Sequence, residues 1–120
     1  MDAWGGIAAL QFGLSVMWTN LRSRGFGLND LTRLMSAIPS KLARLDNRKG
    51  KLAAGYDADI VIWDPEARFT VVPEIIRHRH KLTPYSDMEL CGVVEKSFVG
   101  GEQVYANGGF SEAKSGKLLT

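Results

Sequence analysis

Apolar residues recur every three or four positions in the first part of the chain, which predicts helices. The first such stretch covers 7–24, and its apolar positions form one face of an amphipathic helix. Gly25 follows a basic last turn, a combination typical of a helix C-terminus. A second helix is expected over 28–38 and a short third helix over 39–45, which begins with proline. The sequence therefore predicts three helices in this part.

After residue 50 the pattern changes to that of strands. The runs 60–63 and 69–72 are rich in β-branched and aromatic residues, and Asp64-Pro65 between them is typical of a turn. One or two helical turns are expected over 73–78, which begins with proline. A later Gly-Gly pair predicts a tight hairpin between two further strands, 92–99 and 102–105.

Composition limits what the chain can encode. Its 120 residues suit one domain, whereas a complete (β/α)₈ barrel needs about 250 residues. Fifteen basic residues against 13 acidic ones give a net charge of +2, which argues against nucleic acid or an anionic membrane as a partner. There is one cysteine, no signal-peptide pattern, and no apolar run of about 20 residues. We expect a soluble intracellular protein, cytoplasmic by default, with a peroxisomal or mitochondrial location left open.

The motif His78-Arg79-His80 has the spacing of two metal ligands on a strand. A zinc site needs at least three protein ligands, and the chain has no further histidine. The neighbouring cations Arg77 and Lys81 would repel a dication, and no aromatic residues are interleaved with them as in a nucleic-acid patch. We therefore interpret the segment as a solvated basic stretch.

Other candidate sites are equally incomplete. The carboxylates of Asp57, Asp59 and Asp64 surround a strand without the spacing of a calcium-binding loop, and acidic residues at strand ends commonly serve turns. Gly5-Gly6 precedes a helix, where free backbone N–H groups can meet a polar ligand. Taken by their chemistry alone, these residues make no self-sufficient active site.

Three segments resemble known proteins. Residues 49–64, Lys-Gly-Lys-Leu-Ala-Ala-Gly-Tyr-Asp-Ala-Asp-Ile-Val-Ile-Trp-Asp, resemble the C-terminal signature of the metal-dependent amidohydrolases. Residues 3–14, with Trp-Gly-Gly-Ile, are similar to the loop and helix after the last barrel strand of allantoinases, and 78–85, with His-Lys-Leu-Thr-Pro-Tyr, continue the likeness. Dihydropyrimidinases, hydantoinases and dihydroorotases share this architecture and remain alternatives.

The resemblance implies an α+β fragment of a larger fold. Residues 1–49 would be the last helices of a (β/α)₈ barrel, and 50–120 part of a small β-sandwich with a short helix, a hairpin and a flexible tail from about 107. The apolar face of the first helix would then lie against barrel strands that this chain lacks. We therefore expect Met17 and Trp18 to be partly exposed.

The resemblance also implies a function, the hydrolysis of the cyclic amide of allantoin to allantoate in purine catabolism. In the complete enzyme, a homo-oligomer, two divalent ions (zinc) would activate the attacking water. Their ligands and the catalytic aspartate belong to barrel strands outside this sequence, so no catalytic or metal-binding residue is assigned here, and the chain alone is expected to be inactive. Only Gly5 is assigned a role, in substrate binding through its backbone. A non-catalytic interaction module and a truncated gene product remain alternatives.

Overall fold

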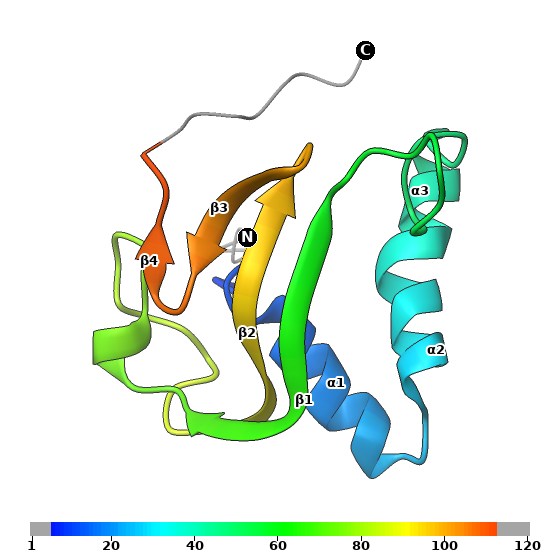
Figure 1. Ribbon diagram of the computed structural model, residues 1–120. Helices are drawn as coiled ribbons and strands as arrows, with labels where there is room; N and C mark the ends of the chain where they lie inside the picture. The colour runs from blue at the N-terminus through cyan, green and yellow to red at the C-terminus, as the bar shows by residue number, and fades with distance from the viewer. Residues whose placement is uncertain (1–5, 113–120) are drawn as a thin grey trace, which may run out of the picture.

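One antiparallel sheet and two helical segments make up the computed structural model, which describes residues 6–112 (Figure 1). The sheet has the strand order β1-β2-β3-β4. In chain order the elements are α1 (Gly13–Ser23), α2 (Leu28–Thr32), η1 (Arg33–Ala37), α3 (Ile38–Leu42), β1 (Ile60–Thr70), η2 (Pro73–Ile75), β2 (Glu89–Val99), β3 (Glu102–Ala106) and β4 (Gly109–Phe110). The expected α+β class is confirmed.

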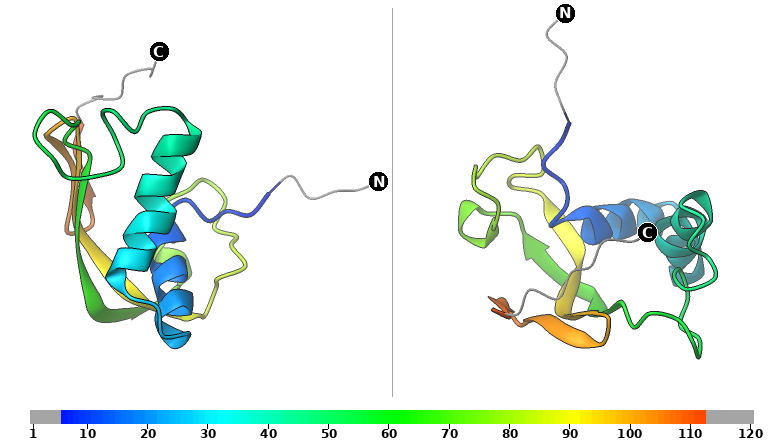
Figure 2. Two further views of the ribbon diagram at one scale, coloured as in Figure 1. Left: turned by 90° about the vertical axis from the view of Figure 1, so that its right-hand side faces the viewer. Right: turned by 90° about the horizontal axis from the view of Figure 1, so that it is seen from above.

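The two helical segments take different positions around the sheet. Helix α1 crosses one face of the sheet behind β1 and β2, and the run from α2 to α3 stands beside β1 (Figures 1 and 2). The loop over 43–59 returns from the end of α3 to the start of β1 (Figure 2). The free edge of β1 therefore faces the second helical segment.

The helices differ from the sequence prediction in two respects. α1 begins at Gly13 rather than at residue 7, because the segment before it is held by the loop between β1 and β2. The two helices expected over 28–45 form one continuous run that ends at Leu42, with the π-helical segment η1 in its middle. Pro39 is the second residue after this segment. Proline lacks an N–H and its ring crowds the preceding turn, so the wider π turn accommodates it without ending the helix.

The prediction of two strands separated by a turn at Asp64-Pro65 is wrong, because the run 60–63 and the first half of the run 69–72 belong to one strand, β1. Asp64 lies opposite Val93 and Arg68 lies opposite Cys91, so three residues of β1 face a single residue of β2. This is a large β-bulge, which interrupts the hydrogen-bond ladder. The Asp64 carboxylate accepts hydrogen bonds from the N–H groups of residues 66 and 67, at 2.8 and 3.2 Å, inside the bulge.

Polar side chains of α1 satisfy other backbone groups of the bulge. The Ser15 hydroxyl donates to the Gly92 carbonyl at 2.6 Å, and the Thr19 hydroxyl accepts from the Cys91 N–H at 2.8 Å. The Trp18 indole N–H donates to the Pro65 carbonyl at 2.8 Å. Since buried backbone groups without partners are costly, these three bonds compensate the interrupted ladder and fix the helix on the sheet.

Two clusters of buried side chains form the core between α1 and the sheet. One contains Phe12, Val71, Ile76 and Leu90, and the other contains Trp18, Leu21, Leu31 and Cys91. Trp18 packs edge-on against the ring of Trp63, with ring centroids 5.8 Å apart, and is only 6% exposed. The expectation that Trp18 is partly exposed is therefore wrong, because the sheet of this chain covers it; Met17 is 37% exposed, as expected.

The expected tight hairpin is confirmed, and of the one or two helical turns expected over 73–78 the structure forms one. Gly100 and Gly101 connect β2 to β3 with φ of 58° and 87°, the positive values that a type I′ turn requires. The 3-10 helix η2 is one turn long and begins at Pro73. The short strand β4 pairs with β3 in the segment where the sequence predicts a surface tail.

Ser15→Ala tests the role of α1 in satisfying the bulge. The variant leaves the buried Gly92 carbonyl without its hydroxyl donor, so the free energy of unfolding should fall by about 1–3 kcal/mol. Ser23→Ala is the matched control, because its exposed hydroxyl donates only to Asn20 of the same helix, and its effect should stay within about 0.5 kcal/mol. Urea denaturation of both variants measures the difference; equal effects would contradict the assignment.

Candidate functional site

The segment that enters α1 is held against the loop between β1 and β2. The Gln11 side chain uses both ends of its amide: Nε2 donates to the Ile75 carbonyl at 2.7 Å, and Oε1 accepts from the Arg77 N–H at 2.8 Å. The Thr83 hydroxyl donates to the Ala8 carbonyl at 3.0 Å. Residues about 65–75 positions apart are thus joined at three points.

Gly5, the one residue to which a substrate role is assigned, lies outside the described residues. Its position in the sequence is three residues before Ala8, whose carbonyl is the first point held by the loop. Gly6 is described and has a φ of 132°, in the range that favours glycine. The bonds of Thr83 and Gln11 hold the chain at residues 8 and 11.

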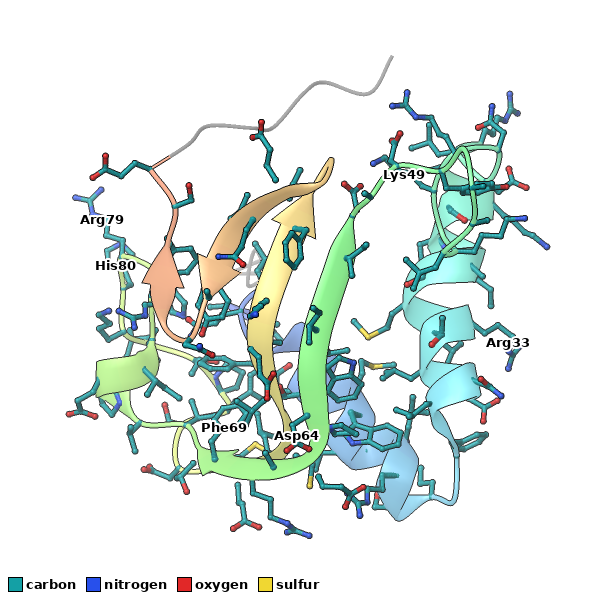
Figure 3. All side chains as sticks on the ribbon, viewed as in Figure 1. Arg33, Lys49, Asp64, Phe69, Arg79 and His80 are labelled. Atoms are coloured by element: carbon teal, nitrogen blue, oxygen red, sulfur yellow. The ribbon has the colours of Figure 1, made fainter. Side chains whose placement is uncertain are left out.

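The amidohydrolase-like signature contains a cluster of ion pairs. Lys49 pairs with Asp59 and with Asp57, the latter at 3.1 Å, and Arg48 pairs with Asp57 at 2.9 Å. The second oxygen of Asp59 accepts a hydrogen bond from the Gly100 N–H at 2.9 Å. Figure 3 shows Lys49 beside the start of β1, where the tip of the β2–β3 hairpin also lies. The cluster therefore ties the loop after α3 to the start of β1 and to the hairpin turn.

The same contacts set the charge states of the cluster. The Lys49 ammonium, and after it the Arg48 guanidinium, lower the pKa of Asp57. Lys49 and then the Gly100 N–H lower the pKa of Asp59. The hydrogen bonds to Asp59 and Asp57 raise the pKa of Lys49. Because each carboxylate is paired with a cation of the same chain, Asp57 and Asp59 act as partners in this ion-pair cluster.

Gly50 of the signature has a steric reason to be glycine. Its φ is 91°, and a Cβ at this position would lie 2.1 Å from the Ser40 hydroxyl oxygen and 2.7 Å from the Ser40 Cβ. Ser40 is buried on α3. The signature glycine thus allows close packing of the loop against the helix.

The basic stretch near residue 80 serves the fold at two of its positions. Arg77 donates to the Gly108 carbonyl at 3.1 Å, and the Lys81 ammonium donates to the Ile76 carbonyl. Arg79 and His80 are exposed, at the β4 edge of the molecule (Figure 3). His78 is half-buried, and its Nε2 has no hydrogen-bond partner among residues 6–112.

The described residues do not fit the two-metal site that the resemblance implies. Within residues 6–112 no three His, Cys, Asp or Glu side chains lie close enough together to hold a metal ion. His78-Arg79-His80 gains no third ligand from the fold, and Asp57 and Asp59 are engaged with Lys49.

A groove of about 630 Å³ separates the second helical segment from β1. Apolar side chains of both walls line it, including Leu31, Met35, Ile60 and Trp63. The ion-pair cluster of Lys49 also contributes to its lining. The groove therefore offers an apolar surface along the free edge of β1 rather than a set of reactive groups.

The contacts of Gln11 and Thr83 were not predicted from the sequence, although each joins residues more than 60 positions apart. Gln11 interrupts an otherwise apolar stretch, and Thr83 lies within the allantoinase-like 78–85 segment. Both features are weak signals, because the chemistry of a glutamine or a threonine does not predict which distant backbone groups its side chain will bond.

Comparison with known proteins identifies the family. The model of the amidohydrolase family matches residues 10–105, and the chain belongs to this family. Allantoinase of Streptomyces avermitilis is 43% identical over 98% of this chain and 26% of its own length. Allantoinase of Arabidopsis thaliana is 38% identical over 98% of this chain and 24% of its own length. The expected likeness to allantoinases is confirmed, and the chain spans about a quarter of the length of these relatives.

Solved structures of cyclic-amide hydrolases share the fold. The L-hydantoinase (dihydropyrimidinase) from Arthrobacter aurescens matches with a TM-score of 0.82 and 31% identity, over 91% of this chain and 24% of that one. The D-hydantoinase (dihydropyrimidinase) from a Thermus species matches with a TM-score of 0.83 and 28% identity, over the same shares. In the described part of the chain, no helix has the length and apolar character to span a membrane.

The pKa shifts predict a pH dependence of stability. The pKa values of Asp57 and Asp59 in the folded chain lie below the ordinary value of 3.8, so their stabilisation is present above about pH 4 and is lost as the pH falls through the folded-state values. Asp59→Asn should therefore reduce the number of protons taken up on acid unfolding, by at most about one. The urea midpoint of this variant should fall less steeply as the pH is lowered.

Asp46→Asn is the matched control for this experiment. Asp46 lies in the same loop, and its carboxylate makes no ion pair with any residue from 6 to 112. Urea midpoints measured between pH 6 and pH 3 should separate the two variants, and an unchanged acid dependence in Asp59→Asn would show that the cluster contributes nothing.

Proposed function

We propose that this chain supplies the C-terminal part of an allantoinase, which hydrolyses the cyclic amide of allantoin to allantoate. The observation that carries the proposal is the 43% identity with the Streptomyces avermitilis allantoinase over 98% of the chain. The likeness covers the whole described fold, including the signature with Lys49 and the segment that enters α1.

In this proposal the chain has two parts. Residues 1–49 are the last helices of a (β/α)₈ barrel, and 50–120 form one side of a small β-sandwich. The exposed apolar side chains of the second helical segment, Leu34, Ile38 and Leu42, support this assignment, since each is 38–87% exposed. Such a face is expected to be covered when the remaining three quarters of the relatives' length is present.

The catalytic metals of the complete enzyme, two divalent ions proposed to be zinc, would be held by residues outside this chain. The contribution proposed for this chain is Gly5, whose backbone groups would hold the ring amide of the substrate without a side chain in the way.

The partner of the complete enzyme is a small cyclic amide rather than nucleic acid or a membrane, and the near-balanced charge of the chain supports this. We place it in the cytoplasm as a homo-oligomer.

A hydantoinase is the second candidate function. The structural matches to the hydantoinases from Arthrobacter aurescens and a Thermus species, with TM-scores of 0.82 and 0.83, favour it. Because these enzymes match the same part of the chain, the fold of this part does not separate the two substrates.

Grafting the chain into relatives tests the proposal. The chain replaces its matching segment in the Streptomyces avermitilis allantoinase and, separately, in the Arthrobacter aurescens hydantoinase. We expect allantoin turnover in the first graft and little hydantoin turnover in the second, because the interface of this chain should fit an allantoinase barrel better.

Each host without its matching segment, and the chain alone with zinc, serve as blanks and should be inactive. Turnover in the hydantoinase graft alone would favour the second candidate. An inactive allantoinase graft that is folded by circular dichroism would overturn the proposed function, and so would turnover by the isolated chain.

A further inference from the structure

We propose that Asn107 is a site of spontaneous covalent modification: its side chain cyclises onto the backbone nitrogen of Gly108 and is deamidated, and the isoaspartate that results releases the edge strand β4. Asn107 and Gly108 form the two-residue turn that connects β3 to β4. The reaction belongs to the chain itself and does not depend on the substrate proposed above.

The turn requires positive φ angles but does not require a carboxamide. Asn107 and Gly108 have φ of 45° and 92°, as in a type I′ turn. The hairpin between β2 and β3 makes the same kind of turn with Gly100 and Gly101 alone. Since glycine adopts these angles without a side chain, the Asn107 carboxamide is not needed to form the turn.

The two groups that react are both free. Asn107 is exposed, and its carboxamide makes no hydrogen bond with any residue from 6 to 112. The Gly108 N–H, which is the nucleophile, also donates to no acceptor within that range. Gly108 has no side chain to crowd the approach of its nitrogen to the Asn107 Cγ atom. No hydrogen bond to described residues therefore has to break before the attack.

The other asparagines of the chain lack this combination. The residues that follow them all carry side chains, and these are Leu21, Asp30 and Arg48. The N–H groups of Asp30 and Arg48 donate to backbone carbonyls at 3.1 and 3.0 Å. Leu21 lies inside α1, where backbone N–H groups bond within the helix. At each of these positions the attacking nitrogen is crowded and hydrogen-bonded, so Asn107 should react fastest.

The reaction balances with water as its only co-reactant. The Gly108 nitrogen loses its proton and attacks the Asn107 Cγ atom, and the bond from Cγ to Nδ2 breaks. Ammonia leaves with that proton, and a cyclic succinimide remains. Water then opens the ring: attack at Cγ gives an aspartate with an ordinary backbone, whereas attack at the main-chain carbonyl carbon gives isoaspartate, whose backbone contains an additional carbon atom.

The turn is at a place in the fold that opens readily. β4 is the outermost strand of the sheet and is only two residues long (Figure 1). It is held by its pairing with β3 and by the contact between the Tyr105 and Phe110 rings, whose centroids are 5.2 Å apart. Short edge segments open locally at a lower free energy than core strands, which allows the Asn107 side chain to reach the geometry of attack.

Isoaspartate does not fit the pairing of β4. The register places Ala106 opposite Gly109, with two residues between them, and an additional backbone carbon disturbs a turn of this length. The Arg77 guanidinium donates to the Gly108 carbonyl at 3.1 Å, a contact that depends on the same turn. No residue of β4 belongs to the two buried clusters, so the rest of the fold should persist.

Ageing of the full 120-residue chain tests the modification. After incubation at mildly alkaline pH, trypsin places each asparagine in a separate peptide. The peptide over 97–114 should gain about 1 Da, because an amino group is replaced by a hydroxyl group. Its deamidated fraction should exceed that of the other asparagine peptides about tenfold, because their attacking nitrogens are hydrogen-bonded. Equal fractions in all peptides would overturn the site.

Arg48→Gly is the matched control for the role of the structure. It places a glycine after Asn47, which is exposed like Asn107, but the N–H at position 48 donates to the Leu45 carbonyl at 3.0 Å. Asn47 should therefore react more slowly than Asn107 in this variant. Equal rates at the two positions would overturn the assignment, because the free Gly108 N–H would then contribute nothing.

Hydrogen exchange at Ser111 tests the release of β4. The Ser111 N–H donates to the Val104 carbonyl at 2.9 Å. Chromatography separates the aged chains, and the isoaspartate form should exchange this amide about tenfold faster than the unmodified chain. Asn107→Asp keeps the ordinary backbone, and an aged Asn107→Gly chain keeps the turn without the carboxamide, so both should retain the slow exchange. Slow exchange in the isoaspartate form would overturn the release of β4.

Discussion

The fold depends on how α1 satisfies the interrupted ladder between β1 and β2. Three residues of β1 face Gly92 alone, which leaves backbone groups of both strands without ladder partners. Side chains on one face of α1, those of Ser15, Trp18 and Thr19, supply partners for the groups at 65, 91 and 92. Helix and bulge therefore require each other: the bulge creates buried polar groups, and the polar positions of an otherwise apolar helix face satisfy them.

Two further sets of contacts join distant parts of the chain to this centre. The ion pairs of Lys49 with Asp57 and Asp59 hold the start of β1, and Asp59 also accepts the Gly100 N–H of the hairpin turn. The amide of Gln11 holds the loop that follows β1. Both ends of β1 are thereby held by polar contacts, while its bulged middle is held by α1. Signature residues therefore have structural roles in this chain: Lys49 pairs with Asp57 and Asp59 at the start of β1, and Gly50 lets the loop pack closely against Ser40 of α3.

Local patterns predicted the elements better than their connections. The hairpin followed from Gly100-Gly101, because this turn chemistry is local. Asp64-Pro65 also looks like a turn in the local sequence. It forms a bulge instead, because β1 pairs with β2 on both sides of it and α1 supplies hydrogen-bond partners, and neither contact is visible in the local sequence. Of the candidate site, the signature was visible in the sequence, whereas the partners of Gln11 lie more than 60 positions away.

Hydrogen exchange at the Cys91 amide tests the pairing of helix and bulge most directly. This N–H has the Thr19 hydroxyl as its acceptor at 2.8 Å. The account predicts slow exchange in the wild type and in Thr19→Ser, and exchange about tenfold faster in Thr19→Val, which keeps the shape but removes the acceptor. The same rate in all three proteins would contradict it.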